Sequence, residues 1–130
     1  MIGKDIDVTP MEAFFLMVLN GKKSLSGSEI VQNIRENLGL NWTPSAGATY
    51  KILQSMEKKE LIIETTQKED REDQRMRTYA MAVKGKETLP IITKRILKIA
   101  LFVDSCCPEL ISEEDNVIRI VRIGNGKNSC

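Results

Sequence analysis

The chain has 130 residues, of which 42% are hydrophobic and 28% charged, a composition typical of one soluble globular domain that can carry an added association helix. Its net charge of +1 argues against a protein that coats DNA without selection, because such binders are strongly basic, so DNA contacts would have to come from local patches. There is no histidine, and Cys106, Cys107 and Cys130 form no paired framework, so neither a structural metal nor a cofactor is expected.

The beginning of the chain, residues 1–8, is rich in charge and lacks the apolar core of a secretory signal. The longest apolar stretches, Ala13–Leu19 and Ile99–Val103, are far shorter than the roughly 20 residues that a membrane-spanning helix needs. We therefore expect a cytoplasmic protein that does not cross a membrane.

A first helix is predicted to begin after Thr9, because Thr9-Pro10-Met11-Glu12 has the form of a capping box with proline at the first helical position. The helix continues through the apolar run Ala13–Leu19, and Gly21 suits its left-handed end. Because nearly every side of this helix is apolar, it is expected to be mostly buried.

A second helix is predicted from another capping box, Ser26-Gly27-Ser28-Glu29. Ile30, Ile34 and Leu38 follow at helical spacing, with polar residues on the rest of the circumference, so this helix is expected to be amphipathic. Gly39 marks its end.

The third helix is predicted over Ser45–Lys59, with Thr43 or Ser45 as its cap and Pro44 at its entrance. Its apolar face carries Ile52, Leu53 and Met56. The opposite, polar face carries Gly47, Tyr50, Lys51, Gln54 and Lys58. Gln and Lys side chains bond to base edges or phosphates, small residues permit close approach, and a helix N-terminus attracts phosphate. The pattern indicates a recognition helix for DNA, with a merely solvated polar face as the alternative.

Two strands are predicted next, Leu61–Thr66 and Arg77–Val83, from their β-branched residues and alternation. The polar stretch between them has no glycine, so a tight turn is not expected and the stretch is predicted to be an exposed wing. Its candidate phosphate or minor-groove contacts are Lys68, Arg71, Arg75 and Arg77. Four acidic neighbours offset these charges, which leaves a solvated loop as the alternative. Three helices and this hairpin predict a mainly α fold with a small β-hairpin (α+β), a winged helix-turn-helix.

The order of these motifs resembles the PadR family of winged-helix regulators from about Glu12 to Leu89. The strongest likeness is Pro44–Glu57 followed by Leu61-Ile62, which is similar to the family's stretch of Ser, Gly, Tyr and Leu leading to Glu and then Leu-Ile. Further similar positions are Gly27-Ser28-Glu29-Ile30 and, after the wing, Arg75, Arg77, Tyr79 and Lys84-Gly85-Lys86 through Leu89.

The chain departs from that pattern at Ser28, where the family usually has tyrosine, at Glu60, where it favours a turn glycine, and at Ala82 or Val83, where threonine is typical. These departures blur operator preference and ligand response. The resemblance implies transcriptional repression and a small-molecule effector in the dimer cleft, which the sequence does not name. It also implies that Ser45, Gly47, Tyr50 and Lys51 contact DNA. The polar face of the third helix adds Gln54 to these candidate contacts.

After a winged-helix domain over residues 1–83, residues 84–130 are predicted to form a C-terminal helical dimerisation region. An apolar seam in this region repeats at spacings of three, four, three and four residues, through Leu89, Ile92, Ile96, Ile99 and Val103. A second copy of the chain would bury this seam, and the alternative is a helix that packs on its own domain. Pro90 lies near the start, so the helix either begins around Thr88 or kinks there.

Beyond Pro108, a short helix from Ser112 is favoured as an addition to the dimer, although the apolar residues at 117–123 also suit a strand. The adjacent Cys106 and Cys107 could sense oxidants or crosslink subunits. A buried or inert pair is favoured because no activating cluster is visible, and no function is assigned to them.

Together these features predict a sequence-specific regulator that binds a near-palindromic operator in double-stranded DNA as a homodimer, and that acts as a repressor. An enzyme is not expected, because the sequence has no Gly-rich phosphate loop, nucleophile elbow or metal-ligand spacing. The alternative is a winged helix that binds other proteins and not DNA, which would be expected to expose an apolar patch in place of the polar face.

Overall fold

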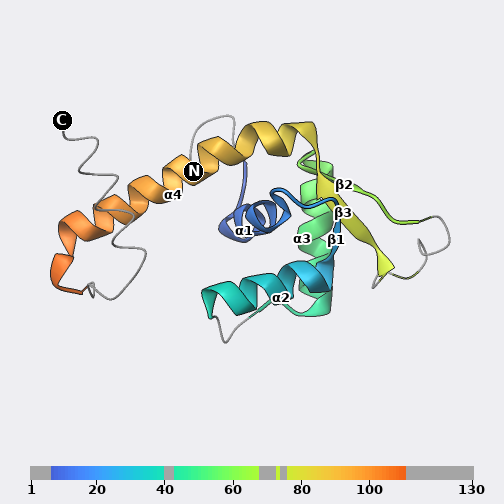
Figure 1. Ribbon diagram of the computed structural model, residues 1–130, viewed down its shortest axis with the longest axis horizontal. Helices are drawn as coiled ribbons and strands as arrows, with labels where there is room; N and C mark the ends of the chain where they lie inside the picture. Colours follow the sequence, from blue (N-terminus) through green and yellow to red (C-terminus); the bar gives the residue numbers. More distant parts are fainter. Residues whose placement is uncertain (1–6, 40–42, 68–72, 74–75, 111–130) are drawn as a thin grey trace. The chain divides into compact units, whose positions relative to one another are not determined.

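The computed structural model of the protein describes residues 7–39, 43–67, 73 and 76–110 (Figure 1). In chain order its elements are α1 (Pro10–Leu19), β1 (Leu25–Ser26), α2 (Gly27–Leu38), α3 (Ala46–Lys58), β2 (Ile62–Glu64), β3 (Thr78–Met81), α4 (Val83–Cys106) and the 3₁₀-helix η3 (Pro108–Leu110). Helices with a small antiparallel sheet make the α+β winged helix that the sequence predicts.

Both predicted capping boxes are present. The Thr9 hydroxyl accepts a hydrogen bond from the Glu12 N–H at 3.2 Å, and the Glu12 carboxylate accepts one from the Thr9 N–H at 2.9 Å. Ser26 and Glu29 repeat this exchange at the start of α2, at 3.2 and 2.8 Å. Each box satisfies amide groups that have no partner within the helix, which is why α1 and α2 begin where their sequence motifs do.

Left-handed residues follow the first three helices. Gly21 after α1 and Gly39 after α2 have φ values of 78° and 62°, as the sequence predicts. After α3 the left-handed position is taken by Glu60, with a φ of 64°. A side chain with a Cβ is strained in this conformation, so Glu60 occupies a position that glycine would fill with less strain.

The hydrophobic core lies where α1, α2 and α3 meet one another and the sheet. Of the apolar face predicted for α3, Leu53 and Met56 are buried and Ile52 is half-buried. Leu38 at the end of α2 is 51% exposed, so the buried face of α2 is shorter than its spacing suggests. The fully buried apolar side chains are Phe15, Leu16, Leu19, Ile30, Met56, Leu61 and Ile62.

The sheet has the strand order β1-β3-β2. The predicted hairpin is present, with β2 antiparallel to β3 and Ile63 opposite Ala80. Strand β1 was not predicted; it pairs with the other edge of β3, with Leu25 opposite Tyr79. A two-residue strand has no sequence pattern of its own, because it forms only through its pairing with a distant segment.

Helix α4 begins at Val83, well before the start around Thr88 that Pro90 suggested, and Pro90 lies inside it. Val83 was predicted to end the second strand and instead opens this helix. The first turn lies close to the sheet, because a Cβ placed on Gly85 would collide with the Leu61 carbonyl oxygen and would lie 2.8 Å from Met81 Cγ. Glycine is therefore required where α4 leaves the sheet.

The chain divides into two compact units between Pro90 and Ile91, and α4 extends from the first unit into the second. The domain boundary predicted after residue 83 stays a prediction. The short helix predicted from Ser112 lies outside the described residues.

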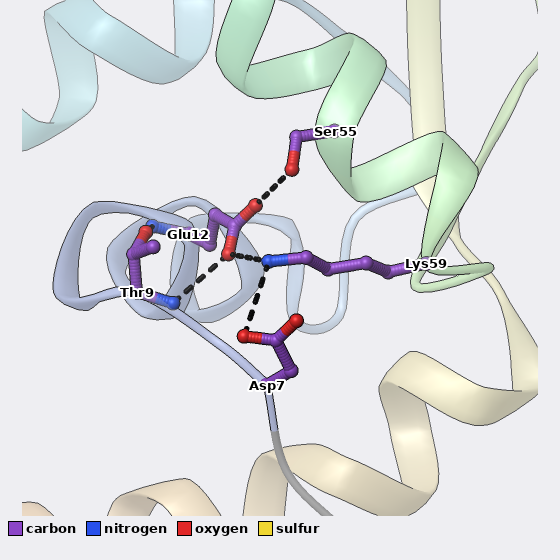
Figure 2. Close-up of polar contacts among 5 residues, drawn as sticks. All are labelled: Asp7, Thr9, Glu12, Ser55 and Lys59. Atoms are coloured by element: carbon purple, nitrogen blue, oxygen red, sulfur yellow. Dashed lines mark hydrogen bonds and ion pairs between the residues drawn. The ribbon is translucent and has the colours of Figure 1, made fainter. Parts of the chain in front are cut away.

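A buried carboxylate joins α1 to α3. Figure 2 shows Glu12, whose residue is only 2% exposed, directed at Ser55 and Lys59. The Lys59 ammonium donates to Glu12 Oε1 at 2.8 Å, and the Ser55 hydroxyl donates to Oε2 at 2.8 Å. Burial alone would raise the pKa of this carboxyl, but the hydrogen bonds from Lys59, the Thr9 amide and Ser55 together hold the pKa below its ordinary value of 4.5. Glu12 therefore stays ionised and fastens the two helices together.

Candidate nucleic-acid interface

The N-terminus of α3 is built by Ser45, whose hydroxyl accepts a hydrogen bond from the Ala48 N–H at 3.1 Å. Of the two caps considered in the sequence, Thr43 and Ser45, the structure therefore uses Ser45. Ser45 and Gly47 are both exposed, and a Cβ built on Gly47 would meet no atom within 4 Å. This end of the helix is open to solvent and free of large side chains.

One turn further along, the polar face of α3 presents Tyr50, Lys51 and Gln54. Lys51 and Gln54 are exposed, and Tyr50 is half-buried. The phenol, ammonium and amide groups on this face are hydrogen-bonding groups of the kinds that bind base edges and phosphates. The five residues proposed from α3, Ser45, Gly47, Tyr50, Lys51 and Gln54, thus lie on the first three turns of one helix.

Arg77, next to the first residue of β3, contacts this face of α3. Its guanidinium donates to the Tyr50 hydroxyl at 3.4 Å and lies 5.8 Å from the centre of the Tyr50 ring. Arg77 Nε also lies 3.9 Å from a carboxylate oxygen of Glu64 on β2. The hydrogen bond to Tyr50 raises the pKa of Arg77, with a further contribution from the Glu64 carboxylate. Tyr50 and Arg77 were each predicted separately as interface residues, and in the structure they contact one another.

The other wing residues proposed from the sequence, Lys68, Arg71 and Arg75, lie outside the described residues. Their role at the interface stays a prediction.

Beside the polar face, α2 and α3 enclose a groove of about 320 Å³. Gly27 brings the two helices close together, because a Cβ at this position would lie 3.1 Å from side-chain atoms of both Thr49 and Leu53. The charged member of the lining is Arg35, whose guanidinium donates to Thr43 Oγ1 at 2.8 Å and to Gln32 Oε1 at 3.2 Å. The groove is lined by Gly27, Ser28, Val31, Gln32, Arg35, Pro44, Ala46, Thr49, Tyr50, Leu53 and Tyr79.

The α2 residues Ser28, Gln32 and Arg35 were not predicted as site residues. Their spacing of four and three residues places them on one side of a helix, a signal that could have identified a shared face. That this face borders α3 depends on how the two helices pack, which the spacing does not encode.

Tyr79 on β3 also lines this groove and is 2% exposed. Its pKa is raised to about 12, mainly by burial, with further contributions from the nearby carboxylates of Glu57 and Glu64. Burial, followed by the charge of Glu64, also raises the pKa of Glu57. Tyr79 is therefore a neutral, buried structural residue at physiological pH.

The residues of the seam predicted on α4 differ in solvent exposure along the helix. Leu89 and Ile92 are buried within the single chain, and Ile96 is half-buried. Ile99 and Val103 are 56% and 44% exposed, and the neighbouring Phe102 is 69% exposed. The C-terminal part of α4 therefore presents apolar side chains to solvent, whereas the first two members of the predicted seam do not.

Cys106 is exposed and Cys107 is half-buried at the end of α4. Among the residues that the structure describes, no cluster of side chains suited to a metal ion is present. Within the same residues, no helix is long and apolar enough to cross a membrane.

The model of the transcriptional regulator PadR-like family matches residues 15–90. A PadR family transcription regulator from Clostridium difficile has a similar structure, with a TM-score of 0.62 and 25% identity over 75% of this chain and 97% of that one. A transcriptional regulator from Clostridium thermocellum gives a TM-score of 0.61 at 17% identity, over 72% of this chain and 86% of that one. The structure of RosR from H. salinarum gives a TM-score of 0.57 at 18% identity, over 95% of this chain and 94% of that one. No curated protein matches the sequence.

Proposed function

The chain belongs to the PadR-like family of transcriptional regulators, and from this premise we propose that it binds operator DNA through the polar face of α3. The observation that carries this proposal is the exposure of Lys51 and Gln54 on the helix whose Tyr50 contacts Arg77. These side chains are presented by a helix whose opposite side is fixed in the core by Leu53 and Met56. A rigid helix with an exposed hydrogen-bonding face is suited to insertion into a major groove.

Each group on this face has a defined chemical use against DNA. Lys51 and Gln54 are suited to donate to acceptors on base edges or to phosphate oxygens. At the helix N-terminus, the free amide groups and the Ser45 hydroxyl are suited to a phosphate. Gly47 would let the DNA backbone approach the helix closely. Wing residues Lys68, Arg71 and Arg75 are proposed to add phosphate contacts beside the helix.

We further propose that the protein represses transcription as a homodimer on a near-palindromic site. The support is the exposed apolar end of α4, with Ile99, Phe102 and Val103, which a second copy would cover. Twofold symmetry would give two recognition helices spaced to meet successive major grooves, about one helical turn apart. A subunit with a net charge of +1 is expected to bind DNA weakly by itself. In a dimer the two DNA-binding surfaces act together, which raises the overall affinity. Bound at a promoter, it would exclude other proteins from that DNA.

The DNA proposal is tested by selecting genomic fragments that the protein binds and measuring their affinity by gel shift. A Lys51→Ala, Gln54→Ala double variant is expected to bind a selected fragment more weakly, by roughly 1–3 kcal/mol for each side chain that bonds to a base edge in the wild type. The control is Lys86→Ala, which removes an exposed positive charge at the start of α4. In the chain, β3 separates this position from the wing. Unchanged binding by the double variant would reject this face as the DNA-binding surface.

A further inference from the structure

Arg77 was predicted from the sequence as a direct contact to a phosphate or to the minor groove, and its surroundings suit a different role. Its side chain is 25% exposed, and it lies between Tyr50 on α3 and Glu64 on β2. The carboxylate of Glu64, also 25% exposed, partly neutralises the positive charge of Arg77 and so weakens its attraction for a phosphate. Lys51 has none of this enclosure, since it is exposed on the outer face of α3.

We propose that Arg77 is a positioning residue for Tyr50: it fixes the phenol of Tyr50 so that the phenol, and not the arginine, contacts the DNA. This proposal rests on the DNA-binding function proposed above. Two interactions of different kinds hold the ring, a hydrogen bond at 3.4 Å to its oxygen and the guanidinium at 5.8 Å from its centre. The second distance is within the range in which a cation is attracted to an aromatic face.

The direction of the hydrogen bond gives the pair its chemistry. A guanidinium can only donate, so the Tyr50 oxygen accepts, and its own hydrogen remains available to donate to a further group. DNA presents acceptors to such a donor at phosphate oxygens and at purine N7 atoms in the major groove. Because hydrogen bonds in a chain polarise one another, the bond from Arg77 also makes Tyr50 a better donor. Arg77, which directly precedes β3, would thus connect the hairpin to the recognition helix and act on DNA through Tyr50.

The test compares the affinity and salt dependence of binding for the full chain and its variants, by fluorescence anisotropy on an end-labelled duplex chosen from the bound genomic fragments. Arg77→Met and Tyr50→Phe are each expected to weaken binding roughly tenfold, and the double variant no more than either alone. The slope of log affinity against log salt is expected to stay unchanged in Arg77→Met, because the arginine makes no bond to a phosphate. Lys51→Ala serves as the reference for a residue that touches DNA directly.

Arg77→Lys is the decisive variant, because it keeps the positive charge and removes the planar group that lies against the ring. A positioning role predicts that lysine fails to restore binding. A phosphate-binding role predicts near-normal affinity for Arg77→Lys, a slope reduced by about one in Arg77→Met, and additive effects in the double variant, and any of these would overturn the proposal. Thermal unfolding of each variant separates a damaged fold from a damaged interface. If the wild-type chain selects no DNA, the proposed function itself fails, which is a different outcome.

Discussion

Helix α3 carries two groups of polar side chains that contact different surroundings. Ser55 near its C-terminal end, together with Lys59 directly after its last residue, binds the buried carboxylate of Glu12 on α1. Lys51 and Gln54, on neighbouring turns, extend into solvent. One helix therefore uses hydrogen-bonding residues both to hold the fold together and to present a surface. The comparison shows that polarity alone does not identify a binding face, since burial and partners separate the two uses.

The largest effect is expected at the buried group. In Lys59→Met the Glu12 carboxylate loses its positive partner, and the free energy of unfolding should fall by about 2–3 kcal/mol. The effect is smaller than for a fully buried ion pair because the Lys59 side chain is 23% exposed. Lys58→Met, one residue earlier and exposed, should change it by less than about 0.5 kcal/mol. Urea unfolding of both variants makes the measurement. Equal effects at the two lysines would erase the distinction between the groups.

The comparison extends to glycines, which also serve either the fold or the surface. In Gly85→Ala the new Cβ would collide with the Leu61 carbonyl oxygen, a backbone atom that cannot move aside cheaply. We expect the free energy of unfolding to fall by about 1–2 kcal/mol, because overpacking outweighs the helix propensity gained from alanine. The same urea titration checks it, and a stability equal to or above wild type would show that α4 can shift away from β2.

Acid should weaken the buried group specifically. The pKa of Glu12 is lower in the folded chain than its ordinary value of 4.5, so near that value the unfolded chain binds more protons. Its contribution to stability is therefore complete above 4.5 and is lost as the pH falls through the lower folded pKa. Glu12→Gln should remove this part of the pH dependence, at most about 1.4 kcal/mol per pH unit, in urea titrations between about pH 3 and 6. An unchanged dependence would mean that other carboxylates cause the acid sensitivity.

What the sequence could predict follows the range of the interactions concerned. The starts of α1, α2 and α3 were predictable because each cap bonds only three residues along the chain. Glu12 was predicted as the partner of Thr9, but its bond to Lys59, 47 residues away, depends on the packing of α1 against α3. Strand β1 was missed for the same reason, since it exists only through β3.

The candidate site shows the same division. The exposed face of α3 follows from helical spacing, and the residues proposed from it lie together on that helix. The contact between Arg77 and Tyr50 spans 27 residues, so no local pattern announces it. Of the two alternatives that Pro90 left for α4, the start around Thr88 is wrong, and the kink at Pro90 stays a prediction. One proline does not prevent a helix that is anchored on the sheet by its first turn.

The smallest effect is expected on the surface side of α3, at Gly47. A Cβ there meets nothing within 4 Å, so Gly47→Ala should raise the free energy of unfolding by about 0.5 kcal/mol through helix propensity and a less flexible unfolded chain. DNA binding should weaken nonetheless, because the added methyl group would stand between the helix and a closely approaching DNA backbone. Urea unfolding and gel shifts on one preparation measure both quantities. A variant that gains stability and keeps its affinity would show that glycine is not needed at the interface, and would leave the exposed face to Tyr50, Lys51 and Gln54 alone.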